Sequence, residues 1–149
     1  DGKSVAVKIV GDHVFFTYDS FGVVCYSIAD LIAPLIPGTD PQEIWTKNGT
    51  DQRPVALARF KLQDVAFFGS AELAEWSGGA AGMDVVRVNG RDFIYVAYGD
   101  AGVIKIDWTD PAKPVLMQHA DTVGFASDVS VINGRAYVAD SGGGLTLLK

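Results

Sequence analysis

Three turns in the sequence combine an aspartate with glycines and are the first candidates for chemistry. They read YDSFG, YGDAG and DSGGG, and the carboxylates of Asp19, Asp100 and Asp140 suggest cation binding. A calcium loop needs several oxygen ligands at alternate positions, as in D-x-D-x-D-G, whereas each of these turns offers one carboxylate. We therefore expect hairpin turns in which the aspartate bonds its own backbone, and we predict no metal ligand there.

Histidine and cysteine, the other common metal ligands and nucleophiles, are scarce. His13 and His119 each lie at a turn or in an expected strand, without a second histidine or cysteine nearby, so we expect ordinary, partly exposed histidines. A metal site assembled from residues distant in sequence stays open. Cys25, in the apolar run FGVVCYSI, is expected to be a small buried hydrophobe. A single cysteine excludes an internal disulfide and a cysteine-based zinc cluster.

The motifs of common catalytic and cofactor sites are missing from the sequence. The glycine-rich stretch GSAELAEWSGGAAG lacks the lysine of a phosphate loop and the strand-to-helix context of a dinucleotide site, so we interpret it as a flexible linker. No H-E-x-x-H, C-x-x-C or G-x-S-x-G occurs, and no haem-attachment C-x-x-C-H. We therefore predict no catalytic residue and no cofactor.

The composition indicates a folded chain of one-domain size. It has 149 residues, 48% of them hydrophobic, and a formal net charge of −6 with lysines and arginines scattered singly. Binding to nucleic acid or to an anionic membrane surface is disfavoured, because neutralising phosphates needs clustered basic residues. No apolar run is long enough to cross a bilayer, and we expect no membrane insertion. The first residues do not form a signal peptide, which leaves the compartment open.

An internal repeat organises the chain. The stretch that begins at Asp84, DVVRVNGRDFIYVAYGDAG, is repeated by DVSVINGRAYVADSGGG from Asp128, 44 residues later. Both run strand, NG turn, strand, glycine turn and strand, with apolar residues at every second position. The NG pairs supply the positive φ of a two-residue type I′ hairpin. A period of 40 to 45 residues is that of a propeller blade.

Two further units are expected before this pair. The N-terminal segment repeats the pattern with Gly11-Asp12 at the NG turn, and a degenerate unit of two strands fits between Val55 and Trp76. The blade-like units are then about 4–30, 55–76, 84–118 and 125–149.

An insertion at about 28–53 interrupts the repeat. It holds three prolines and no sustained alternation, so we expect a long loop with one short helical turn near Asp30 to Ala33. Insertions in propellers project from one face, where binding functions often reside. Trp45 lies in this loop and is a candidate anchor for a protein partner. Trp76 and Trp108 are expected to pack in the core or between blades.

The segment GDAGVIKIDWTDPAKPVLMQHADTVGFASDVSVINGRAYVAD resembles the LVIVD repeat. The glycine turn, the strand ending in aspartate, the D-P-A-x-P connector, the next strand, the link of small residues and the D-V-x-V to A-Y-V-A-D pair fall at Gly99 to Gly102, Val103 to Asp107, Asp110 to Pro114, Val115 to His119, Thr122 to Ala126, and Asp128 to Asp140. The resemblance is best from Asp84 to Lys149, looser over the first thirty residues and poor in between. It implies an all-β fold of four-stranded antiparallel propeller blades, often in proteins exported to the cell surface or periplasm, with roles in binding and adhesion.

The chain length departs from a closed propeller. Rings close with about four to eight blades, whereas 149 residues at this period allow roughly three and a half. We therefore expect part of a ring, continued by the remainder of a longer protein or completed by other chains. An uncovered last blade would leave an edge strand and an apolar face exposed.

Asp84 and Asp128 head equivalent strands and are the remaining candidates for a site. Each could line the central channel or bond backbone groups of the adjoining blade, and the second interpretation is preferred because a repeated residue usually serves the repeat. The favoured function is a non-catalytic, protein-binding or scaffolding propeller segment, with Trp45, Asp84 and Asp128 as candidate partner-binding residues. The alternatives are part of a propeller oxidoreductase or metal-dependent hydrolase with its site in the channel, or a docking subunit of a redox complex.

Overall fold

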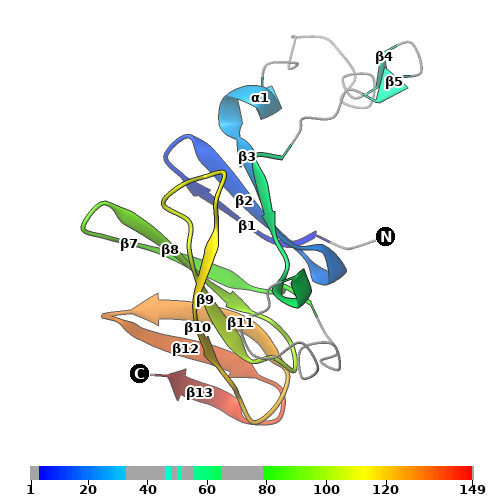
Figure 1. Cartoon of the computed structure of the whole chain (residues 1–149). Helices are drawn as coiled ribbons and strands as arrows, with labels where there is room; N and C mark the ends of the chain where they lie inside the picture. Colours follow the sequence, from blue (N-terminus) through cyan, green and yellow to red (C-terminus); the bar gives the residue numbers. More distant parts are fainter. Residues whose placement is uncertain (1–3, 33–45, 48–49, 52–55, 65–78, 149) are drawn as a thin grey trace.

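The structure, a computed structural model, describes residues 4–32, 46–47, 50–51, 56–64 and 79–148. Alternating apolar and polar residues form three small antiparallel sheets that follow one another along the chain (Figure 1). The first sheet contains β1 (Ser4–Val10), β2 (His13–Tyr18), β3 (Gly22–Ser27) and β6 (Ala58–Phe60); the second contains β7 (Met83–Val88), β8 (Arg91–Ala97), β9 (Val103–Asp107) and β10 (Val115–Ala120); the third contains β11 (Ala126–Ile132), β12 (Arg135–Asp140) and β13 (Gly144–Leu148). The described strands are those of partial propeller blades and form no closed ring.

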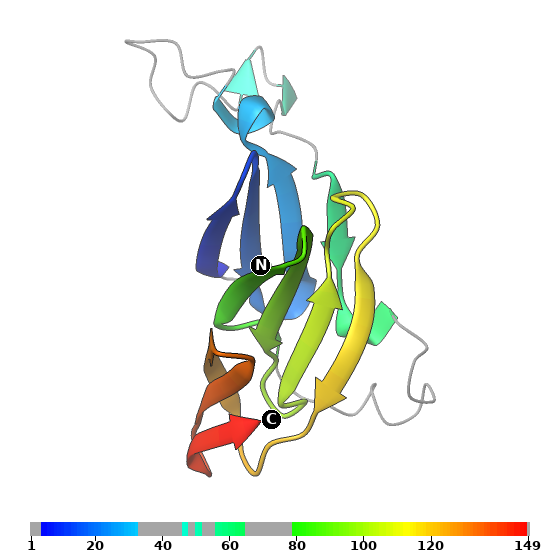
Figure 2. The same cartoon turned by 90° about the vertical axis from the view of Figure 1, so that its left-hand side faces the viewer.

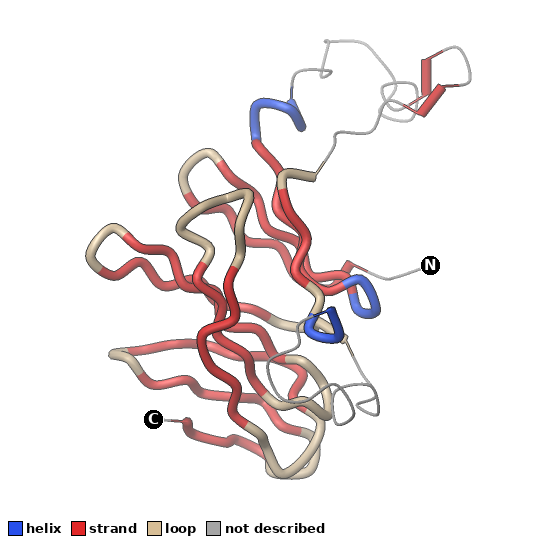
Figure 3. The backbone as a smooth tube through the Cα atoms, in the orientation of Figure 1, coloured by secondary structure: helices blue, strands red, loops and turns tan. Residues whose placement is uncertain are grey.

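The sheets stack face to face, so that each buries a side of its neighbour. Strand β1 contacts β7, and β11 contacts both β7 and β8. Figure 2 shows the third sheet below the second and the first sheet above it, and Figure 3 shows the long strands joined mostly by short turns. The second sheet therefore has a described sheet on both faces, whereas the first and third sheets each have a described neighbouring sheet on one side.

The hairpin turns follow the predicted chemistry. At both NG pairs the asparagine and the glycine have positive φ, 52° and 77° at Asn89-Gly90 and 51° and 74° at Asn133-Gly134. This is the pattern of the type I′ turn, whose twist matches that of the flanking strands. In the first sheet Gly11 has a φ of 55°, and Asp12 is not among the residues with positive φ, as in a turn with glycine at its first central position.

The segment expected to form a separate unit at 55–76 behaves differently where it is described. Strand β6 pairs antiparallel with β3, with Phe60 opposite Val23, so it is the fourth strand of the first sheet. The insertion separates the third and fourth strands of one sheet, which made the fourth strand resemble the start of a new unit. Residues 65–76 lie outside the described residues.

The remaining described elements are short. The helical turn expected near Asp30 to Ala33 is α1, which spans Ile28–Ile32 and directly continues β3. Strands β4 (Thr46–Lys47) and β5 (Thr50–Asp51) pair within the insertion, and single 3-10 turns lie at Asp19–Phe21 and Leu62–Asp64. The rest of the 28–53 insertion, Trp45 included, lies outside the described residues.

Two apolar clusters hold the stack together. The cluster between the first two sheets contains large side chains, among them Phe15, Leu62, Tyr98 and Trp108. The cluster between the second and third sheets consists of alanines and valines: Ala97, Val103, Ala126, Val129, Ala136 and Val138.

Candidate protein-binding face

The uncovered side of the third sheet presents apolar residues to solvent. Alternation along the strands turns Val129 and Val138 toward the second sheet and leaves Leu145 and Leu147 of β13 on the opposite side. Leu145 is 73% exposed and Leu147 44% exposed, whereas Val103, the residue after the glycine turn of the second sheet, is 4% exposed. We call this side, which also carries Asp128, the outer face of the third sheet.

Asp84 joins neighbouring sheets. Its Oδ1 accepts a hydrogen bond from Val85 N at 2.9 Å, and its Oδ2 accepts one from Val131 N of the third sheet at 2.8 Å. Lys8 Nζ of the first sheet lies 3.7 Å from Oδ1. Of the two roles considered from the sequence, Asp84 therefore has the second, bonding the backbone of the adjoining blade. A carboxylate that accepts from backbone amides is a strong, geometrically specific link.

Asp128 occupies the same place one sheet further along. Its Oδ1 accepts from Val129 N at 2.9 Å, the same local bond that Asp84 makes. It is exposed, and in the part of the chain that the structure describes no hydrogen bond joins it to another sheet. Gly82 packs against it, since a Cβ there would lie 1.9 Å from Asp128 Oδ1. Asp84 and Asp128 are thus equivalent in sequence, but only Asp84 has a described sheet after its own to bond with.

The glycine turns confirm the expected backbone role for Asp140. Its carboxylate is buried and accepts hydrogen bonds from Gly124 N at 3.1 Å and Gly142 N at 3.4 Å, with Thr146 Oγ1 at 3.4 Å. Burial opposes ionisation, but the donors Gly124, Gly142, Gly143 and Thr122 together hold the pKa of Asp140 below its ordinary value. Asp19 and Asp100 are exposed. Among the described residues, no group of three or more His, Cys, Asp or Glu could hold a metal ion.

Cys25 is held by packing, and His119 contacts a backbone carbonyl. Cys25 is fully buried, and burial raises the pKa of its thiol to about 11, so the thiol is protonated at neutral pH. His119 Nε2 lies 2.6 Å from Ala101 O, and His13 is half-buried at the start of β2.

Trp108 packs between blades, as the sequence predicted. Its ring meets Phe15 edge-on at 5.3 Å, and its Nε1 donates to Pro111 O at 3.1 Å. That proline belongs to the D-P-A-x-P connector, where Asp110 Oδ1 accepts from Ala112 N at 3.0 Å and so caps the turn. The connector is therefore a structural part of the interface. Trp45, the other aromatic candidate, lies outside the described residues.

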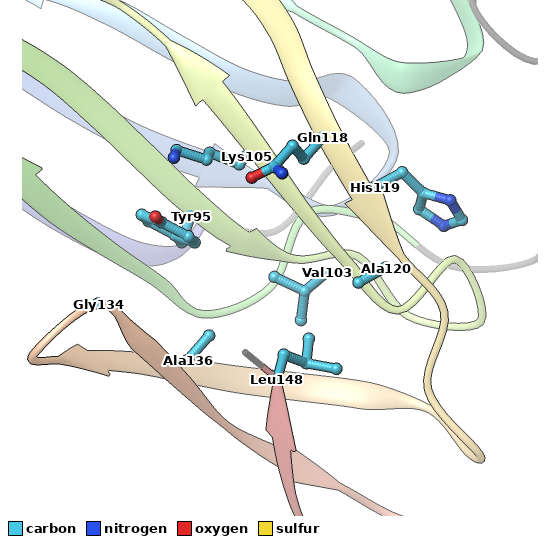
Figure 4. Close-up of a pocket in the computed structure, with 9 residues that line it drawn as sticks. All are labelled: Tyr95, Val103, Lys105, Gln118, His119, Ala120, Gly134, Ala136 and Leu148. Carbon is cyan, nitrogen blue, oxygen red and sulfur yellow. The ribbon is translucent and has the colours of Figure 1, made fainter.

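A cavity that the sequence did not reveal lies between the second and third sheets. Its volume is about 400 Å³. Figure 4 shows Tyr95, Val103 and Lys105 on the side of the second sheet, with Ala136 and Leu148 on the side of the third. The Lys105 ammonium lies 4.6 Å from the Phe93 ring centre and 5.4 Å from that of Tyr95, so its charge rests on aromatic faces.

Comparison with known protein families identifies the repeat. The LVIVD repeat model matches residues 80–122 and 123–148, which contain the second and the third sheet respectively. Comparisons with curated proteins and with solved structures give no match. No helix in the described part of the chain is long and apolar enough to cross a membrane. The first sheet shares the strand order of the second but lies outside the matched residues. The chain therefore carries two LVIVD repeats, a repeat associated with β-propeller structure, and each repeat builds one blade-like sheet.

Proposed function

We propose that this chain is a non-catalytic propeller segment that binds protein through the uncovered sides of its end sheets. The observation that carries the proposal is the exposure of Leu145 and Leu147 on the outer face of the third sheet, in a repeat whose other members bury the corresponding side. Contiguous exposed apolar residues on a folded domain are typical of protein interaction sites. The occupant that fits this face is a further propeller blade.

The polar part of the same face supports a blade as the occupant. Asp84 receives a backbone N–H from the next sheet, and Asp128 presents an equivalent carboxylate where a next sheet would lie. In an added blade, a backbone N–H of the first strand would donate the hydrogen bond to Asp128, as Val131 N of β11 does to Asp84. The carboxylates of the repeat would then serve assembly, which favours binding over chemistry in the central channel.

The opposite end of the stack supports a second contact surface. On the first sheet, Phe15 and Thr17 are buried toward the second sheet, and Phe16, Tyr18 and Tyr26 lie on the other side. The Phe16 ring is 6.2 Å from that of Tyr18 and 6.0 Å from that of Tyr26. Ile9 is 68% exposed. Aromatic residues grouped this way are common anchors in protein interfaces.

The test is the native mass of the purified chain over a range of concentrations, measured by light scattering. We expect association beyond the 15.8 kDa of one chain, because the outer face of the third sheet exposes Leu145 and Leu147. Leu145→Lys should weaken that association at least tenfold, since it places a charge in the apolar face.

Val123→Lys is the matched control for this substitution. Val123 is 87% exposed in the loop before β11, so the same change of an exposed aliphatic residue to lysine should leave the mass unchanged. A chain that stays at 15.8 kDa up to millimolar concentration would contradict the proposed function.

Location at the cell surface or in the periplasm is part of the same proposal. It follows from the resemblance to LVIVD-repeat proteins. Fractionation of the source cells, followed by immunodetection of the chain, tests it.

A further inference from the structure

A groove between the outer strands of the first two sheets collects basic side chains. Its volume is about 510 Å³, and it lies between β6 on one side and the D-P-A-x-P connector with the start of β10 on the other (Figure 2). Phe60 and Leu116, both buried, line it, and Pro114 and Val115 add apolar surface. We call this the basic groove.

The core and the connector fix the backbone that carries the basic residues. Phe60 is 4% exposed and Leu62 is 1% exposed, so the chain on both sides of Lys61 is anchored. In the connector turn, Lys113 N donates to Asp110 O at 3.0 Å. Lys61 and Lys113 are far apart in the sequence, and the packing of the two sheets brings them to one groove.

The charge of the basic groove is opposite to that of the whole chain. Its lining holds Arg59, Lys61 and Lys113 against the single carboxylate of Asp64, whereas the chain has a formal net charge of −6. Arg59 Nη2 lies 3.3 Å from Asp64 Oδ2. In the part of the chain that the structure describes, Lys61 and Lys113 form no ion pair. Two ammonium groups can therefore receive an anionic ligand.

We propose that the basic groove binds a short acidic segment of a partner protein, in which an aliphatic side chain is flanked by Asp or Glu residues. The carboxylates of the segment would pair with Lys61 and Lys113, and its aliphatic side chain would pack on Val115, which is 54% exposed. Basic clusters recognise acidic motifs in this way. This site goes beyond the proposed function, because it lies away from the outer face of the third sheet.

The size and the lining of the basic groove favour a peptide over a nucleic acid or an anionic membrane. A volume of about 510 Å³ is that of a site for a ligand of a few residues. The apolar lining suits an aliphatic side chain, which a phosphate backbone lacks. A long polyanion would also extend beyond the groove and be repelled by a chain of net charge −6.

The probe is the fluorescein-labelled peptide Glu-Glu-Leu-Glu-Glu, and its binding to the whole chain is measured by fluorescence anisotropy at low ionic strength. We expect saturable binding that weakens with added salt, because salt screens exposed charges. Glu-Glu-Ser-Glu-Glu should bind about threefold more weakly, since the aliphatic contact is lost. Lys-Lys-Leu-Lys-Lys should not bind.

Lys113→Glu tests the basic groove directly. Lys113 is exposed, so the charge reversal leaves the core intact and replaces attraction by repulsion. We expect the affinity for Glu-Glu-Leu-Glu-Glu to fall about fivefold. Arg135→Glu is the matched control, since Arg135 is exposed on the third sheet and the substitution changes the net charge by the same amount. It should change the affinity less than about twofold.

Three results would overturn this inference. Absent peptide binding, or an equal loss of affinity in Lys113→Glu and Arg135→Glu, would show that the basic groove is not the site. Binding of poly-dT that is as tight as that of the peptide and equally sensitive to Lys113→Glu would show a general polyanion site. A tenfold gain in affinity in Glu72→Gln/Glu75→Gln would show that acidic residues of the chain itself compete for the groove.

The same measurement separates this inference from the proposed function. Leu145→Lys, which tests association through the outer face of the third sheet, should bind the peptide as the unmodified chain does. Peptide binding by a chain that stays monomeric would support the basic groove while the proposed function fails, and association without peptide binding would do the reverse.

Discussion

The two interfaces between sheets differ in the size of the side chains that fill them. The first interface buries Trp108, Tyr98 and Phe15, and both of its sheets have four strands. The second buries alanines and valines and leaves a cavity of about 400 Å³, and its third sheet has three described strands. The first interface also has a pocket, of about 510 Å³, between Phe60 of β6 and Leu116 of β10, so the interfaces differ in the size of their buried side chains and not in the presence of a pocket.

The largest expected difference between the interfaces comes from truncating a core residue in each. Trp108→Ala should lower the free energy of unfolding by about 3 to 5 kcal/mol, the usual cost of removing a buried tryptophan. It also removes the edge-on contact with Phe15 and the bond to Pro111 O. Val138→Ala, in the second interface, should cost only about 2 kcal/mol, because only two methyl groups are lost.

Urea unfolding of both variants measures these values. The comparison fails if Val138→Ala is the more destabilising of the two. That result would show that the third sheet depends on its small residues more than the first interface depends on its large ones.

The glycine turns give the second comparison. Gly102→Ala should destabilise by about 2 to 5 kcal/mol, from the left-handed backbone and from overpacking against Ala120 O. Gly144→Ala has the same φ requirement but open surroundings, so it should cost only about 1 to 2 kcal/mol. Thermal unfolding of the two variants checks the difference, and equal losses would show that packing at Gly102 is relieved by movement of β10.

The two repeated aspartates give a smaller contrast. Asp84→Ala leaves Val131 N without its acceptor and should cost about 1 to 3 kcal/mol. Asp128→Ala loses only its local bond to Val129 N and should cost less than about 1 kcal/mol in the isolated chain. Hydrogen exchange at Val131 provides a direct measurement. Its amide should exchange faster in Asp84→Ala than in the unmodified chain, and at an unchanged rate in Asp128→Ala.

The sequence predicted the features that repeat, including one bond between sheets, and missed the pairing of β6 and the surroundings of Gly144. The NG turns, the D-P-A-x-P connector and the bonding of Asp84 to the next blade followed from local chemistry and from the 44-residue period. Strand β6 was assigned to a separate unit because the insertion places it far along the chain from β3. The open space at Gly144 could not be predicted, because nothing in a glycine turn indicates what lies beside it.

The last comparison concerns pH and the residues that lie four positions before Gly102 and Gly144. In the second sheet it is Tyr98, whose hydroxyl oxygen accepts from Leu62 N of the first sheet at 3.3 Å. In the third sheet it is Asp140, whose carboxylate accepts from groups of its own sheet and of the loop before it. The second sheet is thus tied to its neighbour by a neutral group and the third is stabilised by a charged one.

Acid should therefore weaken the third sheet through Asp140. Its pKa is lowered in the folded chain, so its contribution to stability is complete above the ordinary aspartate pKa of about 3.9 and is lost as the pH falls through the lower, folded value. Asp140→Asn should lower the melting temperature at pH 7 and flatten its decline between about pH 5 and pH 2, because the amide does not titrate. Asp121→Asn, on the exposed loop before β11, is the control and should keep the slope of the unmodified chain. An unchanged slope in Asp140→Asn would mean that other carboxylates govern the acid transition, and that the turn of the third sheet tolerates a neutral residue as the second sheet does with Tyr98.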